Sequence, residues 1–204
     1  MSSKKQFLTY LKPRLSEKRF QHSVGVMQTM DKLADIYNLD KEQATTAGIL
    51  HDIAKELESD QYKKIIKDAK IEIRCKEDKN FHFYLHGPVG AYLAEKELQI
   101  KDPVILNAIE THTFYGVFDE QFNTRLNWCL HFSDILEPNR DWHQVKWLHD
   151  HGDELANTIY SGQLHKSIVF FTGGIIEWFE NDNLPVHPNI YRAYAEYAKT
   201  LAKQ

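Results

Sequence analysis

The chain is poor in several kinds of residue, and each shortage excludes a class of protein. Only two of its 204 residues are cysteines, Cys75 and Cys129, and their spacing suits neither a disulfide framework nor a cysteine metal site. We interpret both as free thiols in a reducing cytosol. No apolar stretch follows the N-terminal Met-Ser-Ser-Lys-Lys-Gln, so no signal peptide is visible.

Long apolar runs and long basic runs are missing as well. The most apolar window, residues 168–179, is interrupted by Thr172, Gly173 and Gly174 and is too short to span a bilayer. The formal net charge is −4, from 25 basic and 29 acidic residues. We therefore expect a soluble, cytoplasmic protein whose partners include no membrane and no nucleic acid polymer.

Helical periodicity dominates what is present. Phe20, Val24, Met27 and Ala34 follow the i, i+4, i+7, i+14 spacing of one helix face. No strong strand pattern competes, and residues 71–74 are the only short candidate. These patterns predict an all-α fold, a bundle of eight to ten helices. The length fits one domain spanning residues 1–204.

Several helix boundaries can be predicted from capping residues. Asp40 can cap a helix, and Gln43, three residues later, can reach back to it. Asp102-Pro103 and Gly152-Asp153 are two further expected helix starts. Helices are also expected at residues 126–136 and 188–203. A long loop is expected at residues 70–85.

Four histidines and two aspartates form the ligand set that two neighbouring metal ions would need: His22, His51, Asp52, His86, His112 and Asp134. Asp52 and Asp134 each end an apolar run, where an uncompensated carboxylate would be costly. A cation must therefore neutralise them. Lys55 lies three residues after Asp52, so a plain ion pair is the alternative to a metal there.

The adjacency of His51 and Asp52 constrains the site. Neighbouring helical residues point about 100° apart, so both can reach one metal only at a helix end or along an edge. Imidazole and carboxylate ligands suit iron, manganese, zinc or nickel better than calcium. Six ligands shared by two ions leave positions open for water and substrate, which is typical of a catalytic site. His131, three residues before Asp134, is interpreted as a core histidine; the alternatives are a residue that supports the ligands or a proton donor.

Ordered motifs around these residues resemble a known family. The H…HD…D pattern of His22, His51-Asp52 and Asp134 is similar to that of the HD-domain metal-dependent phosphohydrolases. The blocks resemble most closely those of the YqeK-type symmetrical diadenosine tetraphosphate hydrolases: Arg19-Phe-Gln-His22, Gly48-Ile-Leu-His-Asp-Ile-Ala-Lys-Glu56, Leu85-His-Gly-Pro-Val-Gly-Ala91, Ala108-Ile-Glu-Thr-His-Thr113 and Asp134-Ile-Leu-Glu-Pro-Asn-Arg140.

The resemblance covers about residues 15–145 and implies an HD-domain helical bundle there, followed by a helical C-terminal extension at 146–204. It implies that His22, His51, Asp52 and Asp134 hold one ion, and that Asp52 bridges to a second ion held by His86 and His112. Iron is the first expectation for both ions, with manganese, zinc, nickel and magnesium as alternatives. Residues 114–116, Ser133 and the tail after residue 145 depart from the family pattern.

Roles also follow for the residues around the ligands. Asp52, Lys55 and Asp134 are expected to be catalytic, and substrate contacts are expected from Arg19, Lys55, Thr113 and Arg140. Arginine offers two oxygens a planar fork, and lysine offers a point charge.

The resemblance favours hydrolysis of diadenosine tetraphosphate at its centre, giving two ADP, by metal-activated water. The partner would then be a small dinucleoside polyphosphate or nucleotide. HD proteins of this size often pair, so a homodimer is included. The alternatives are another HD phosphohydrolase acting on nucleoside monophosphates or cyclic dinucleotides, and a non-catalytic metal- or nucleotide-binding module. His86 and His112 argue against the monophosphatases, and the Gly-Tyr-Pro signature of the cyclic-dinucleotide group is absent.

Overall fold

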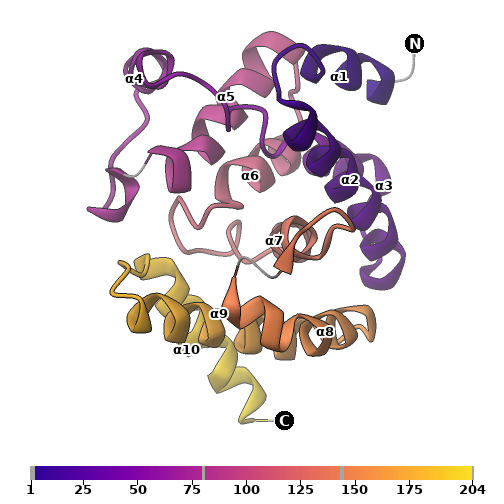
Figure 1. The fold of residues 1–204 in the computed structure, drawn as a ribbon, viewed down its shortest axis with the longest axis vertical. Coiled ribbons are helices and arrows are strands. Elements are labelled where there is room, and N and C mark those ends of the chain that lie inside the picture. Colours follow the sequence, from indigo (N-terminus) through magenta and orange to yellow (C-terminus); the bar gives the residue numbers. More distant parts are fainter. Residues whose placement is uncertain (1–2, 80, 143–144, 204) are drawn as a thin grey trace. The chain divides into compact units, whose positions relative to one another are not determined.

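A computed structural model describes residues 3–79, 81–142 and 145–203. Within these ranges the chain forms ten α-helices and no β-strand, which confirms the all-α prediction (Figure 1). The helices are α1 (Ser3–Leu11), α2 (Glu17–Tyr37), α3 (Lys41–Leu50), α4 (Ser59–Asp68), α5 (His86–Leu98), α6 (Pro103–Thr111), α7 (Arg125–Leu136), α8 (Lys146–Tyr160), α9 (Leu164–Asn181) and α10 (Pro188–Leu201). None of the described helices is long and apolar enough to cross a bilayer.

The chain divides into two compact units, residues 1–139 and residues 140–204. The first unit contains α1 to α7, and the second contains α8, α9 and α10. The single domain expected from the sequence, with its core at about 15–145 and an extension at 146–204, stays a prediction. In both units the described secondary structure is helical.

Helix α2 is the central element of the first unit. It packs against α3 and α7, while α6 packs against α3 and α5 (Figure 1). Met30 and Leu33 of α2 are fully buried, as is Trp128 of α7. Each such side chain contributes about 1.5–3 kcal/mol by leaving water. Because α2 is covered on more than one side, its buried surface is wider than the single helix face predicted from the sequence. Phe20, Val24 and Met27 lie at the edge of this buried surface and are only partly buried.

Two predicted helix starts are present, and one interaction differs from the prediction. Asp40 caps α3 by accepting the Gln43 N–H, and Asp102 caps α6 by accepting the Val104 N–H. The Gln43 side chain does not reach back to Asp40; its Nε2 donates to Asp102 Oδ2 at 2.9 Å. The glutamine therefore ties the start of α3 to the start of α6 instead of closing a local capping box.

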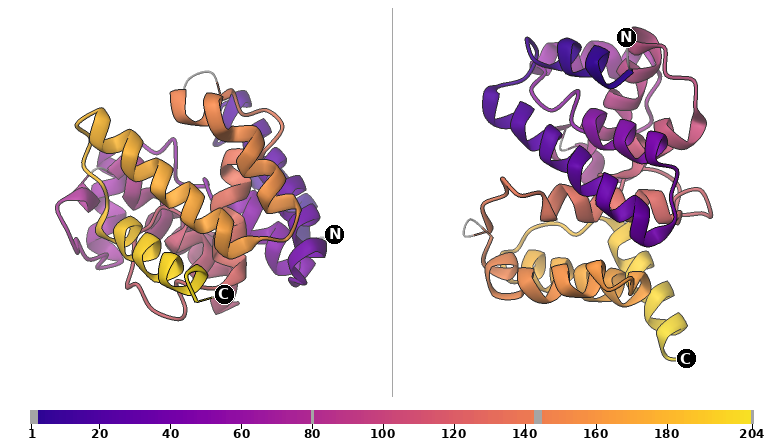
Figure 2. Two further views of the ribbon diagram at one scale, coloured as in Figure 1. Left: turned by 90° about the horizontal axis from the view of Figure 1, so that it is seen from below. Right: turned by 90° about the vertical axis from the view of Figure 1, so that its right-hand side faces the viewer.

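The helix start predicted at Gly152-Asp153 is wrong, because α8 begins at Lys146 and continues through Gly152. The ring of Trp142 packs where a Cβ of Gly152 would stand. The glycine is therefore explained by side-chain packing and not by a helix boundary. In the second unit α9 packs against both α8 and α10, as Figure 2 shows.

The segment predicted as a long loop, residues 70–85, contains no strand in its described part. It contains a single 3₁₀ turn, η1 (Glu77–Lys79), and a π-helical turn, η2 (Phe81–Leu85), that leads directly into α5. The strand candidate at residues 71–74 is irregular. Thr113 holds the end of the segment, since its hydroxyl donates to the Tyr84 carbonyl at 2.6 Å.

Candidate metal centre

The six predicted ligands come from five segments of the first unit, and four of them lie at helix ends. His51 is the C-cap of α3, and Asp52 follows it in a turn. His86 is the first residue of α5, and His112 is the C-cap of α6. A helix end lets adjacent side chains leave the helix in different directions, which is what the His51-Asp52 pair requires. His22 and Asp134, by contrast, project from within α2 and α7.

The histidines converge through their Nε2 atoms in two pairs. His22 Nε2 lies 3.2 Å from His51 Nε2, and His86 Nε2 lies 3.1 Å from His112 Nε2. Two ring nitrogens so close to each other can bind one shared cation when both are deprotonated. All four rings are buried, so bulk water does not separate them.

Asp52 lies between the two histidine pairs and directs one oxygen to each. Its Oδ2 is 3.5 Å from both His22 Nε2 and His51 Nε2. Its Oδ1 is 3.2 Å from His86 Nε2 and 3.9 Å from His112 Nε2. This is the geometry of a carboxylate able to bridge two ions.

Asp134 completes only one of the two groups. Its Oδ1 lies 3.1 Å from His22 Nε2 and 3.8 Å from His51 Nε2. We call His22, His51, Asp134 and Asp52 Oδ2 the first ligand group, and His86, His112 and Asp52 Oδ1 the second. The Asp134 side chain is 29% exposed, against 7% or less for the other five, so the cluster opens to the surface there.

Three of the four histidines are held through their Nδ1 atoms. His51 Nδ1 lies 2.8 Å from the Gly48 carbonyl, and His112 Nδ1 lies 2.7 Å from the Ile109 carbonyl. A carbonyl oxygen can only accept, so Nδ1 carries the proton and Nε2 keeps its lone pair for a metal. His22 Nδ1 is 3.1 Å from Glu137 Oε1.

The electrostatics of the cluster keep most of the ligand atoms in the form that a metal needs. Burial lowers the pKa of His51 to about 4, and burial together with the nearby Lys55 ammonium lowers the pKa of His86 to about 3. Both rings are therefore neutral near pH 7. Burial alone would raise the pKa of Asp52, but the surrounding histidines outweigh it and hold that pKa well below its usual range.

His22 differs from the other ligands in the metal-free protein. Burial lowers the pKa of His22, but its hydrogen bonds to Asp134 and Asp52 outweigh that effect and raise the pKa to about 10. The ring is therefore charged near pH 7 and compensates part of the carboxylate charge. A metal ion that takes Nε2 must displace this proton.

Two of the predicted substrate-binding cations lie against the cluster. Arg19 Nη1 is 2.6 Å from Asp52 Oδ2, so the salt bridge of Asp52 runs to α2. Lys55, the alternative ion-pair partner, places Nζ 3.3 Å from both ring nitrogens of His86. The substrate roles of Arg19 and Lys55 stay predictions.

The other two predicted contacts have different surroundings. The buried Thr113 hydroxyl is engaged with the Tyr84 carbonyl. Arg140 is exposed and is the first residue of the second unit. The substrate roles of Thr113 and Arg140 stay predictions.

His131 is buried in an aromatic setting. Its ring stacks on Phe114 with centroids 4.4 Å apart and lies beside Trp128. Burial lowers the pKa of His131 to about 3. It is thus a neutral core residue on the helix that carries Asp134.

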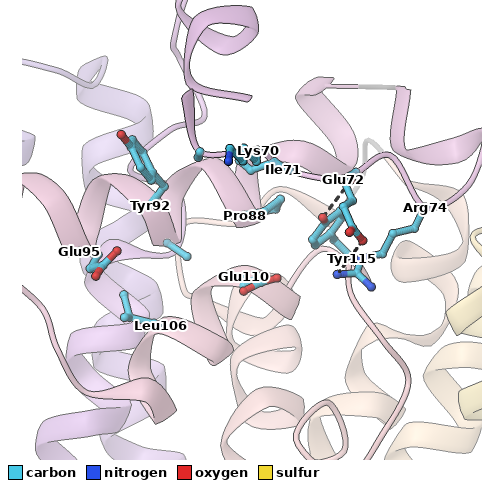
Figure 3. A pocket seen from close by; sticks show the side chains of 12 residues that line it. Lys70, Ile71, Glu72, Arg74, Pro88, Tyr92, Glu95, Leu106, Glu110 and Tyr115 are labelled. Atoms are coloured by element: carbon cyan, nitrogen blue, oxygen red, sulfur yellow. Dashed lines mark hydrogen bonds and ion pairs between the residues drawn. The ribbon is translucent and has the colours of Figure 1, made fainter. Parts of the chain in front are cut away.

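A pocket of about 400 Å³ is lined in part by residues of α5 and α6 (Figure 3). Its walls include Pro88 and Glu95 of α5 and Glu110 of α6. At about 100° per residue, Pro88 and Glu95 lie roughly 180–200° around α5 from His86. Glu110 lies about 160° around α6 from His112. The pocket is therefore on the back of the helices that carry the second ligand group, away from the metal ligands.

Sequence reasoning missed Glu137 as a site residue. Its side chain is only 1% exposed and contacts His22, although the two residues are 115 positions apart. The available signal was a carboxylate three residues after Asp134, at a helix end fixed by Pro138. That signal placed Glu137 near the ligands but could not identify its partner.

Comparisons with known proteins identify the family of this chain. The model of the HD domain family matches residues 19–139, which include all six predicted ligands and end where the first unit ends. Two relatives, from Bacillus subtilis and Halalkalibacterium halodurans, carry the name symmetrical bis(5'-nucleosyl)-tetraphosphatase. They are 31% and 30% identical to this chain over 94% and 92% of its length, covering 96% and 92% of their own.

A solved structure extends the likeness to the fold. It is a protein from Clostridium acetobutylicum described as a "predicted HD superfamily hydrolase involved in NAD metabolism", with a TM-score of 0.83 and 31% identity. The match covers 98% of this chain and 99% of that one. With the family model spanning more than half of the sequence and the cluster of histidines and aspartates in place, this chain belongs to the HD domain family.

Proposed function

We propose that this protein is a metal-dependent hydrolase that cleaves diadenosine tetraphosphate symmetrically into two ADP. The observation that carries the proposal is the division of Asp52 between two ligand groups, with Oδ2 facing one and Oδ1 facing the other. A two-metal site suits displacement at phosphorus. The names of the relatives supply the substrate class.

The donor set supports two ions. His22, His51, Asp134 and Asp52 Oδ2 would hold one, and His86, His112 and Asp52 Oδ1 would hold the other. When bound, such ions polarise phosphoryl oxygens and make water acidic enough to attack phosphorus near neutral pH. Mixed imidazole and carboxylate ligands suit iron, our first proposal, and also accept manganese, zinc or nickel, with magnesium as a further alternative.

The cations beside the cluster bind and orient the polyphosphate in this proposal. Lys55, next to His86, presents a point charge to one phosphate, and Arg19, next to Asp52, can offer its planar fork to another. Thr113 and Arg140 stay proposed substrate contacts. Central cleavage follows if the two inner phosphates lie at Asp52 and a nucleoside extends to each side.

The protein itself supplies a buried site, from which bulk water is excluded, and a carboxylate that can accept a proton. The four histidines and Asp52 are buried, so charges interact strongly across the cluster. Asp134, at the open side, is the carboxylate closest to solvent. It is therefore suited to accept a proton from an attacking water. A cytoplasmic location and a homodimer belong to this proposal as expectations.

A product assay tests the proposal. The full chain, loaded separately with Fe²⁺ and Mn²⁺, is offered diadenosine tetraphosphate, nucleoside monophosphates and cyclic dinucleotides. ADP as the sole product of the tetraphosphate, lost on chelation and restored by metal, is the expected result. AMP plus ATP would contradict symmetrical cleavage. Turnover of monophosphates or cyclic dinucleotides alone would favour another HD phosphohydrolase, and no turnover at all would favour a binding module.

A further inference from the structure

The buried carboxylate of Glu137 has both of its oxygens committed to hydrogen-bond donors. Glu137 Oε1 lies 3.1 Å from His22 Nδ1. Its Oε2 accepts the backbone N–H of Asn139 at 2.8 Å. The side chain is only 1% exposed, so bulk water does not reach its oxygens. Glu137 is therefore an acceptor at both ends.

The local sequence explains how this side chain reaches α2. Glu137 ends α7 with an extended backbone, φ −62° and ψ 145°, as expected for a residue before proline. The side chain thus leaves the helix instead of continuing its face. Gly25 lies three residues after His22, on the same side of α2, and a Cβ there would overlap Glu137 Oε2. The missing side chain at Gly25 makes room for the carboxylate.

His22 needs such an acceptor because of its place in its helix. His51 and His112 end α3 and α6, and each uses the carbonyl three residues earlier, which a helix end leaves available. His22 lies inside α2, where carbonyls already accept from N–H groups four residues later. The acceptor for its Nδ1 must come from another element, and α7 provides it.

We propose that Glu137 is the positioning residue of His22 and that Gly25 is required for this role. By accepting from Nδ1, the carboxylate directs Nε2 toward Asp52 and Asp134 and makes the ring a stronger donor to a metal. The proposal rests on the metal site proposed above and is independent of the identity of the substrate.

The first test is Glu137→Gln in the full chain. An amide has only one oxygen, so it cannot accept from both His22 Nδ1 and the Asn139 N–H, and its NH₂ would face one of these donors. We expect the dissociation constant of one Co²⁺ ion per chain to rise about 10- to 100-fold, measured by equilibrium dialysis of metal-free protein against Co²⁺ alone. The visible absorption of bound Co²⁺ should change with the loss of the His22 ligand.

The second test is Gly25→Ala, which alters no ligand and no charge. The new methyl group displaces the Glu137 carboxylate, so the dissociation constant for Co²⁺ should rise as in Glu137→Gln. The double variant should bind Co²⁺ no more weakly than Glu137→Gln alone, because the two changes break the same interaction. Gly173→Ala in α9 is the matched control, since its Cβ would meet only the Tyr194 ring, and it should bind Co²⁺ like wild type.

The outcomes separate this proposal from the proposed function. Thermal unfolding of each metal-free variant identifies any that fails to fold, and the remaining variant then decides. Affinity within twofold of wild type in a folded Glu137→Gln or Gly25→Ala protein overturns the positioning role and leaves the metal site standing. A wild-type protein that binds no Co²⁺ overturns the metal site and this proposal with it.

Discussion

The two ligand groups that share Asp52 differ in composition and surroundings. The first has two histidines and Asp134, with Glu137 behind His22. The second has two histidines and no carboxylate of its own among the described residues, and the Lys55 ammonium lies against His86. More negative charge should give the first group the tighter hold on a cation. The second group, with a cation beside it, is better suited to receive an anionic substrate.

The largest effect should come from removing the residue that the two groups share. Asp52→Ala deletes both bridging oxygens, so bound metal should fall from two ions per chain toward none. Turnover should drop at least about 1,000-fold, which corresponds to roughly 4 kcal/mol of transition-state stabilisation. Metal analysis and the ADP assay measure the two effects. Asp35→Ala, an exposed carboxylate paired with Lys41, is the control that should change neither. Retained metal and activity in Asp52→Ala would refute the ligand assignment.

Substitutions confined to one group come next and test the difference in affinity. His86→Ala should leave one tightly bound ion per chain, because the first group is intact. His51→Ala, in contrast, should weaken the binding of the ion in the first group. Both should lower turnover by more than about 100-fold, since even partners outside the ligand set cost 10- to 100-fold. If His86→Ala retains both ions or loses both, the proposed division between the groups is wrong.

Lys55→Ala should have a smaller effect and should distinguish a contact with the substrate from a role in metal binding. Loss of a charge-assisted hydrogen bond to phosphate costs about 1.5–3 kcal/mol, so kcat/KM should fall about 10- to 150-fold with metal content unchanged. Steady-state kinetics and metal analysis are the measurements. Lys64→Ala, an exposed lysine paired with Asp68, is the matched control. Loss of metal in Lys55→Ala would indicate a structural role in the second group.

The smallest effect, counted per pH unit, is on the free energy of unfolding of the metal-free protein. His51 and His86 have pKa values lowered to about 4 and about 3, so they remain neutral in the fold while the unfolded chain takes up protons below about pH 6.5. Stability should therefore fall as pH drops from 6.5 toward 3. The pKa of His22 is raised to about 10, so its contribution is present below pH 6.5 and is lost as pH rises toward 10.

Each of these histidines can contribute up to about 1.4 kcal/mol per pH unit within its own window. Urea unfolding at pH 4, 6.5 and 9 measures the profile. His22→Gln should flatten the profile between pH 6.5 and 9, where His51 and His86 are already neutral in both states. An unchanged alkaline slope in that variant would contradict the charged state assigned to His22.

Much of the fold could be predicted because its signals are local. Asp40 and Asp102 cap helices through N–H groups two or three residues away, and Pro138 ends α7 through its own neighbour. The error at Gly152 has the opposite origin. A glycine that admits the Trp142 ring has the same sequence appearance as one that breaks a helix. Only the packing partner distinguishes the two cases.

The candidate site divides in the same way. The ligand types and the need for a helix end at His51-Asp52 follow from residue chemistry. The partners of three residues could not be predicted: Arg19 pairs with Asp52, Gln43 with Asp102, and Glu137 with His22. These partners are 33, 59 and 115 residues apart, respectively, and no periodicity relates them.

By itself, the sequence determined an all-α chain with six metal-ligand candidates, because helix period, caps and donor chemistry depend on residues within about one turn of each other. The tertiary structure decided which oxygen of Asp52 faces which histidines and which acceptor holds His22. Those contacts depend on the packing of α2, α3, α5, α6 and α7, and helix packing is set by side chains from distant parts of the chain.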